Sequence, residues 1–401
     1  MTLVRSGFLL TVAVGLANVL NAAFQFALAR ILEPDEYALV AALFAVVLVG
    51  AIPPLAFQAT TARSVAAELG QGRLAAAGGV LRGTLRAVLA WTAALLVLTA
   101  IGTVAAAAAG LDDAVAVGAT AGTIAVALAI PVVWGGLQCA GRFAALSGAH
   151  ILFAATRLAA GLAIALAGGS VAAVMLGVAG ATALTVIVTA LPLRSLLASA
   201  EDVGRRRLAT RVNAGAALGL TALWALAYSD LLVARLAFSG DEAGAYAAAA
   251  VASRVLLLVP IAATTVLFPR VAVLHDRVRE RRHLLAGLAV VAAASALLTT
   301  FAWIFAEPLI DLLFGSEYAA AESWLGPLCL AMALYGLGVV YLYHFLALGR
   351  ERVAVVLVLL LAAQMVAYAF LHDEPAELVG VQIAFGVLTV IACETWYHLR
   401  R

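Results

Sequence analysis

Six charged residues fall inside stretches of this sequence that are otherwise apolar, and they are the first candidates for chemistry. They are Arg30, Arg157, Asp230, Arg235, Arg254 and Glu394. An arginine at the centre of a lipid bilayer costs about 2.5 to 3.5 kcal/mol, so one persists there when it faces water, a partner or a ligand. A guanidinium can hold two oxygens of a carboxylate or a phosphate at once. The four arginines therefore indicate a binding site for an anionic group.

Arg157 and Arg254 are the most central of the four, because each lies near the middle of a long apolar stretch. We expect both side chains to line a cavity and to bind the anionic part of a substrate; a structural ion pair is the alternative for each. Arg30 and Arg235 lie about one turn from the outer ends of their stretches, where an arginine either guides a substrate or extends to the lipid head groups.

The two intramembrane acids have different expected partners. Asp230 lies five residues before Arg235, which is about 140° around a helix, so these two side chains are poorly placed to pair. We expect Asp230 to pair with an arginine of another helix or to bind a coupling cation. Glu394 precedes His398 by four residues, a spacing that predicts a pair at the membrane interface.

The first apolar stretch carries a polar stripe, which consists of Thr11, Asn18, Asn21 and Gln25. At about 100° per residue these side chains share one helix face. The stripe either lines a cleft, where it can bind a ligand, or forms hydrogen bonds between helices. His150 lies seven residues before Arg157, so it shares a face with that arginine. We expect His150 at the same cavity, with an ordinary structural hydrogen bond as the alternative.

Several enzyme classes are excluded by what the sequence lacks. All 24 basic residues are arginine, so a P-loop lysine and a lysine Schiff base are impossible. Cys139, Cys329 and Cys393 are far apart in apolar stretches, which argues against a disulfide framework or a zinc site. No H-E-x-x-H, G-x-S-x-G or Gly-rich phosphate loop occurs. We expect no catalytic residues, cofactor or metal, and the net charge of +2 gives no indication of a nucleic-acid partner.

The composition identifies the element that must position these residues, the membrane-spanning helix. Of the 401 residues, 65% are hydrophobic and 11% charged, against about 25% charged in soluble domains. Twelve stretches reach the ~20 apolar residues that a spanning helix needs. They are 8–31, 37–61, 87–110, 114–138, 143–167, 171–193, 212–238, 244–268, 284–306, 324–349, 353–371 and 379–397. We therefore predict an all-α integral membrane protein with twelve transmembrane helices.

The charges in the loops predict the orientation of these helices. With a cytoplasmic N-terminus, 20 of the 24 arginines fall in inner loops, and 14 of the 22 acids fall in outer loops. This is the distribution that the positive-inside rule requires, and one missed helix would scramble it. We expect a multi-pass protein of the cytoplasmic membrane with both termini in the cytoplasm.

The two halves of the sequence resemble each other at an offset of about 205 residues. Arg30 corresponds to Arg235, and each half has a proline followed ten residues later by an arginine, Pro53 before Arg63 and Pro260 before Arg270. Tandem repeats are common in transporters. We predict two six-helix lobes, 1–200 and 212–401, joined by a cytoplasmic linker at 201–211. An even number of helices in each lobe gives both the same orientation, related by an axis along the membrane normal.

Several motifs in this order resemble one known family. They are L-E-P-D-E-Y at 32–37, S-D-L-L-V-A-R at 229–235, G-A-Y at 244–246, L-F-P-R at 267–270, E-P-L-I-D-L-L-F-G-S-E-Y at 307–318 and A-L-G-R at 347–350. They are similar to motifs of the polysaccharide-lipid flippases in the multidrug/oligosaccharidyl-lipid/polysaccharide exporter superfamily. The resemblance implies a two-lobed transporter that moves lipid-linked oligosaccharides across the cytoplasmic membrane. Functional lysines of that family have no counterpart here.

The resemblance and the intramembrane arginines together favour a flippase for a polyprenyl-pyrophosphate-linked oligosaccharide, such as an O-antigen or polysaccharide precursor, working by alternating access. Its partners would be that substrate, membrane lipids and glycan-assembly enzymes. The alternative is a cation-coupled multidrug or metabolite antiporter of the same superfamily, with Asp230 as the coupling acid. A membrane scaffold or enzyme subunit that transports nothing is a third possibility, and it predicts that the central arginines affect stability alone.

Overall fold

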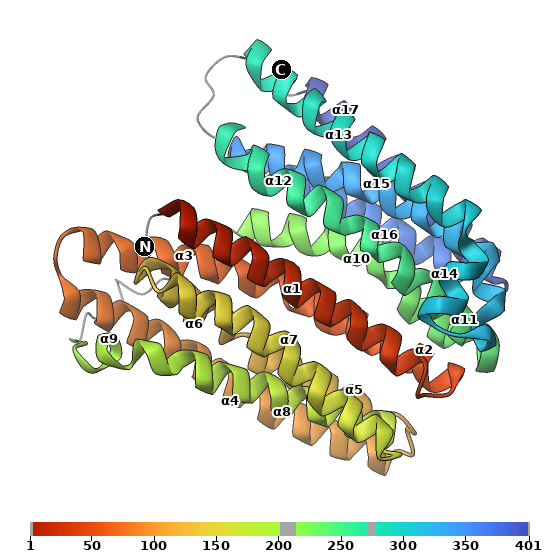
Figure 1. Cartoon of the computed structure of the whole chain (residues 1–401), viewed down its shortest axis with the longest axis horizontal. Coiled ribbons are helices and arrows are strands. Elements are labelled where there is room, and N and C mark those ends of the chain that lie inside the picture. Colours follow the sequence, from red (N-terminus) through yellow and green to blue (C-terminus); the bar gives the residue numbers. More distant parts are fainter. Residues whose placement is uncertain (1–2, 201–213, 272–276, 400–401) are drawn as a thin grey trace. The chain divides into compact units, whose positions relative to one another are not determined.

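The computed structural model of the chain describes residues 3–200, 214–271 and 277–399 (Figure 1). Within these residues the chain forms helices joined by short turns, and no strand occurs in them. Twelve of the described helical stretches are long and apolar enough to cross a membrane. The prediction of an all-α protein with twelve transmembrane helices is therefore confirmed. The predicted linker, 201–211, lies outside the described residues.

The chain divides into two compact units, and the first comprises 1–31 and 50–213. Its helices are α1 (Leu3–Ala29), α3 (Ile52–Gly70), α4 (Leu74–Ala108), α5 (Ala114–Ala127), α6 (Ile130–Cys139), α7 (Phe143–Leu166), α8 (Val171–Ala190), η1 (Leu191–Leu193) and α9 (Arg194–Ala198). Two of the turns are very short, and each contains a glycine with positive φ, Gly141 at 68° and Gly168 at 74°. A residue without Cβ adopts this conformation at little cost, so these glycines separate helices that the apolar pattern alone nearly merges.

The second unit comprises 32–49 and 214–401. Its helices are α2 (Pro34–Gly50), α10 (Ala214–Ala237), α11 (Gly240–Ser253), η3 (Arg254–Leu257), α12 (Leu258–Val271), α13 (Arg277–Ile304), α14 (Ala306–Leu313), η4 (Ser316–Ala321), α15 (Glu322–Ala347), α16 (Val353–Phe370) and α17 (Pro375–Leu399).

The two units share one packing scheme. In the first, α1 packs on α7, α7 on α8, α5 on α8, α3 on α6 and α4 on α5 (Figure 1). In the second, α10 packs on α16, α16 on α17, α15 on α17, α12 on α15 and α13 on α15. The corresponding helices follow each other in the same order along the chain. The repeat expected from the sequence is therefore also present in the contacts between helices within each unit. The orientation of the repeat axis and the cytoplasmic termini stay predictions.

The position of α2 differs from the expected division, in which 1–200 form one lobe. Residues 32–49 group with the second unit. The physical reason is aromatic packing: Tyr37 is fully buried, and its ring centroid lies 6.1 Å from that of Phe314 and 5.8 Å from that of Tyr318. Edge-to-face pairs at this distance stabilise a contact beyond the area that they bury.

Prolines interrupt the helices at matching places in the two halves. The chain breaks at Ala51 before Pro53 and Pro54, where α2 gives way to α3, and it changes to a 3-10 turn at Arg254–Leu257 before Pro260. A proline has no N–H to donate to the residue four positions earlier, so the preceding turn loses a helical hydrogen bond. The break in the second half places Arg254 at an irregular turn inside the span Gly240–Thr264.

The surface of the helices is apolar, as a protein facing lipid requires. Trp91 is 69% exposed, Leu297 72% and Phe370 78%. Several buried threonine hydroxyls are satisfied within their own helices: Thr185 donates to the carbonyl of Ala181, four residues earlier, and Thr120, Thr123 and Thr182 do the same. Because lipid offers no hydrogen bonds, polar groups at this depth need such internal partners.

Candidate functional site

The first cluster of candidate residues lies where α1 packs on α7 in the first unit. Arg157 of α7 is half-buried, and its Nη2 donates to Oδ1 of Asn21 on α1 at 3.0 Å. The guanidinium also lies over two aromatic rings, 5.7 Å from the ring centroid of Phe24 and 5.4 Å from that of Phe153. The structure therefore brings together two residues singled out from the sequence, Arg157 and Asn21. An amide and two aromatic rings hold this guanidinium near the middle of the span Phe143–Leu166.

The remaining residues of the polar stripe continue along α1. Asn18 and Gln25 are half-buried. The Oε1 atom of Gln25 is buried without a hydrogen-bond partner among the described residues, and an amide oxygen in this state can accept a hydrogen bond from a ligand hydroxyl. Thr11 is exposed and donates to the carbonyl of Gly7. The part of the stripe available for chemistry therefore comprises Asn18, Asn21 and Gln25, each about one turn from the next.

His150 of α7 packs against an aromatic ring of α6. Its ring centroid is 4.1 Å from that of Trp134, which belongs to the buried hydrophobic cluster of the first unit together with Leu137, Leu146 and Ala149. Trp134 is also edge-on to Phe153, 6.2 Å away, and Phe153 contacts the guanidinium of Arg157. His150 thus packs on Trp134, which in turn contacts the ring beside Arg157, and its role at a cavity stays a prediction.

The second cluster lies in the second unit and centres on a buried ion pair. Arg254 bonds to Asp230 through Nη2, and the two residues are 7% and 0% exposed. Tyr246 donates to the other carboxylate oxygen at 3.0 Å. The Arg254 guanidinium also donates to the carbonyls of Ala227, at 3.0 Å, and Ala250. Asp230 therefore does pair with an arginine of another helix, and Arg254 does not have the open, cavity-facing position that we expected.

The physical reason is local geometry that no spacing reveals. The 3-10 turn at the end of α11 directs Arg254 back toward α10, where its guanidinium also lies 4.7 Å from the ring centroid of Tyr228. A buried arginine gains most from a carboxylate that accepts it directly, because each charge then compensates the desolvation of the other.

Four further polar residues surround this pair and were missed in the sequence. Nε2 of Gln364 lies 3.2 Å from the carbonyl oxygen of Leu226, 3.3 Å from the hydroxyl of Tyr335 and 3.1 Å from that of Tyr368, and its two N–H groups can donate to two of these three. Gln382 donates to the same carbonyl at 3.4 Å. Both glutamines are fully buried. Gln364 and Gln382 are amides within apolar stretches, as are the amides of the stripe on α1, so the same search for polar residues within spans would have found them.

Arg235 is also held within the second unit. Its Nη2 atom lies 3.5 Å from Oδ2 of Asp35 at the start of α2. The other oxygen of that carboxylate accepts a hydrogen bond of 2.9 Å from the backbone N–H of Gly240, which opens α11 and carries the partial positive charge of a helix N-terminus. Arg30 follows the end of α1 and is exposed. The predicted role of these two arginines at an outer mouth stays a prediction.

Glu394 is the last of the sequence-based candidates. Glu394 pairs with His398 at 2.8 Å, as the four-residue spacing predicts, and it also accepts from the hydroxyl of Tyr341. Within the described residues, no three histidines, cysteines or acids gather into a group that could hold a metal ion.

The fold of the chain matches that of solved transporters. An inward-facing multidrug-resistance MATE-family transporter of the MOP superfamily superposes with a TM-score of 0.73 at 17% identity, over 96% of this chain and 94% of the transporter. The lipid II flippase MurJ in an inward closed conformation superposes with a TM-score of 0.72 at 12% identity, over 98% of this chain and 88% of the flippase. The fold is that of the MOP-superfamily transporters. No protein-family model matches the sequence, and no curated protein does.

A third structure shows how widely this fold varies in chemistry. A MOP-superfamily transporter from Pyrococcus furiosus, described as having a binding pocket of reverse polarity, superposes with a TM-score of 0.61 at 14% identity, over 98% of this chain and 94% of the transporter. The neighbours are transporters and flippases, and they place this chain among multi-pass membrane proteins. Its substrate must be inferred from its own residues.

Proposed function

We propose that this protein is a flippase for a polyprenyl-pyrophosphate-linked oligosaccharide, a precursor of a polysaccharide or O-antigen, and that Arg157 binds the pyrophosphate. The observation that supports this most is the position of Arg157, half-buried at mid-membrane and held by Asn21, Phe24 and Phe153. A pyrophosphate needs a cationic group to reach such a depth, and a guanidinium can hold two of its oxygens at once.

The neighbouring amides suit the sugar part of such a substrate. Asn18 and Gln25 lie on the same helix as Asn21, and the buried Oε1 of Gln25 is an acceptor for a sugar hydroxyl. In this proposal the two lobes rock about the site and open it first to the cytoplasm and then outward. Because the substrate is anionic, an inside-negative membrane potential drives its outward movement, by about 2.3 kcal/mol per charge per 100 mV. Glycan-assembly enzymes would supply the substrate.

The fold supports this proposal, since MurJ, a lipid II flippase, has the same fold. Arg254 has a structural role in the revised proposal, because its charge is neutralised by Asp230.

The test is flipping of a fluorescent polyprenyl-pyrophosphate oligosaccharide in proteoliposomes, measured by quenching of the label in the outer leaflet. We expect Arg157→Gln to slow flipping about 10-fold to 100-fold, the equivalent of a lost charge-assisted hydrogen bond of about 1.5 to 3 kcal/mol. Arg157→Lys keeps the charge and should recover part of the rate. The matched control is Arg86→Gln, which removes an exposed arginine of α4 in the same unit.

Two outcomes would contradict the proposal. If Arg157→Gln flips the substrate at the wild-type rate in equal amounts of folded protein, the site assignment is wrong. If the wild-type protein moves no lipid-linked oligosaccharide while an added cation gradient drives dye efflux, the substrate class is wrong.

The rival function is the cation-coupled antiporter, and the similarity of the fold to a MATE-family transporter supports it. It depends on an acid that can bind a cation or proton. Asp230 is fully buried, bonded to Arg254 and hydrogen-bonded to Tyr246, so its charge is already compensated. Ion-dependent dye efflux that vanishes in Asp230→Asn, with the protein still stable, would favour this rival.

A further inference from the structure

The second unit has a basic cavity that the proposed transport site does not use. Its volume is about 600 Å3, and it is lined by Val278, Glu280, Arg281, Arg282, Leu285, Arg350 and Tyr397. The lining residues come from the first turns of α13, the turn after α15 and the end of α17. Three arginines and one glutamate give the lining a positive charge.

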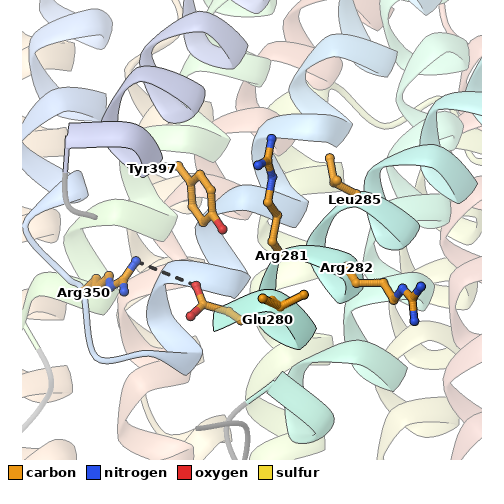
Figure 2. Close-up of a pocket in the computed structure, with 7 residues that line it drawn as sticks. Glu280, Arg281, Arg282, Leu285, Arg350 and Tyr397 are labelled. Carbon is orange, nitrogen blue, oxygen red and sulfur yellow. Dashed lines mark ion pairs between the residues drawn. The ribbon is translucent and has the colours of Figure 1, made fainter. Parts of the chain in front are cut away.

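Glu280, the acid that lines the cavity, does not neutralise the positive charge of the exposed arginines Arg281 and Arg282. Glu280 is 8% exposed, and its Oε1 lies 3.2 Å from Nε2 of His344 and 3.9 Å from Nη1 of Arg350. Figure 2 shows this carboxylate directed toward Arg350, whereas Arg281 lies beside Tyr397 and Arg282 extends to the other side. Arg281 and Arg282 are both exposed. Glu394, one turn before Tyr397, pairs with His398 and accepts a hydrogen bond from the hydroxyl of Tyr341.

The place of the cavity along the helices suits a lipid head group. α13 begins at Arg277 and becomes apolar from Leu284 onward, and α15 ends at Ala347, just before Arg350. The arginines therefore lie at the boundary between charged helix ends and apolar spans, on the side that the arginine bias predicts to be cytoplasmic. Basic pockets between transmembrane helices on this side bind anionic head groups, and guanidinium groups pair well with phosphate.

An apolar path leaves the cavity along α13. Arg281, Leu285, Ala289 and Ala292 lie within about 80° of one another around the helix, so they share a face. Leu285 is 50% exposed, and both alanines are exposed. A lipid with its phosphate at Arg281 and Arg282 can lay an acyl chain along this face, where small side chains leave room.

We propose that this cavity is a binding site for an anionic phospholipid, whose head group is attracted by the three arginines that line the cavity, Arg281, Arg282 and Arg350, while an acyl chain lies on α13. The site is separate from Arg157 and does not depend on what the protein transports. Tyr397, buried at the end of α17, forms the wall beside Arg281.

The test uses the purified full-length protein, stripped of lipid in detergent and titrated with dioleoyl-phosphatidylglycerol while bound lipid is counted by native mass spectrometry. We expect one phosphatidylglycerol to bind far more tightly than phosphatidylcholine. Each arginine near a head group contributes about fivefold, so Arg281→Gln/Arg282→Gln should weaken binding about 30-fold. The matched control is Arg279→Gln, which removes an exposed arginine of the same turn that does not line the cavity.

Three results would overturn the proposal. They are wild-type binding by the double variant, an equal loss in Arg279→Gln, and equal binding of phosphatidylcholine. Glycerol phosphate, which has no acyl chains, should bind at least 10-fold more weakly than the lipid; equal binding would assign the cavity to a soluble phosphate. If the double variant does not fold, Arg350→Gln serves instead, with an expected loss of about fivefold and Arg352→Gln, an exposed neighbour, as its control.

Discussion

The ion pair between Asp230 and Arg254 makes a prediction that separates a structural role from a coupling role. The two side chains are 0% and 5% exposed, so neither charge is screened by solvent. Removing one partner of a buried pair leaves the other charge uncompensated, which costs about 3 to 5 kcal/mol. Asp230→Asn should fall at the lower end, about 3 kcal/mol, because Arg254 keeps its bonds to the carbonyls of Ala227 and Ala250.

Arg254→Met should cost more, about 4 to 5 kcal/mol, since Asp230 would keep only the Tyr246 hydroxyl among the partners described for it. The double variant Asp230→Asn/Arg254→Met buries no charge, and a neutral replacement of a buried pair is often tolerated. We therefore expect it to be more stable than Arg254→Met alone. Such strong non-additivity is characteristic of residues in direct contact.

The assay is unfolding of the purified protein in detergent micelles by added denaturant, performed on wild type, both single variants and the double variant. Additive losses in the double variant would refute the ion pair. A stable Asp230→Asn variant that no longer transports would refute the structural role, because that result requires the carboxylate to bind a cation or proton during transport.

Two glycines make further predictions. A Cβ on Gly161 would lie 2.4 Å from the ring of Phe24. Gly161→Ala should therefore displace the ring beside the proposed pyrophosphate site and slow flipping. Gly148, on the same helix, has open space around it, so Gly148→Ala should leave the flipping rate unchanged. A Cβ on Gly244 would lie 2.4 Å from Cβ of Pro34 and 2.8 Å from its backbone oxygen. Gly244→Ala should therefore lower the free energy of unfolding by about 1 to 3 kcal/mol, measured by denaturant in micelles.

The number of transmembrane helices was predictable because it depends on length and apolar content alone. Each span needs about 20 residues of low polarity, and the sequence carries two independent records of them, hydropathy and the sorting of arginines. The ends were less predictable. α4 begins at Leu74 and α13 at Arg277, well before the predicted starts at 87 and 284, because the apolar pattern does not show where the hydrogen-bonded backbone of a helix begins.

The environment of the central arginines was not predictable in the same way. Arg157 and Arg254 have nearly the same signature in the sequence, a single charge in the middle of an apolar stretch. Their surroundings differ because Arg254 meets a carboxylate 24 residues away, whereas Arg157 meets an amide 136 residues away. Only tertiary packing determines which neighbour each arginine finds. The place of α2 has the same origin, since Tyr37 packs on Phe314 and Tyr318, far along the chain.

Comparing the equivalent helices of the two units shows where the halves have diverged. At the offset of 205 residues that aligns Arg30 with Arg235, Gln25 aligns with Asp230. The pair α1–α7 thus carries amides and an arginine. The pair α10–α16 carries the carboxylate of Asp230 and the amide of Gln364, and Arg254 of η3 neutralises that carboxylate. A substrate that binds by its negative charge is attracted by the first arrangement and not by the second. Because of this asymmetry we assign the pyrophosphate to Arg157 alone. It also predicts that Gln25→Asp, which introduces the acid found at this position in the other half, weakens substrate binding. The reason is that the substitution places a carboxylate on α1, the helix that faces Arg157.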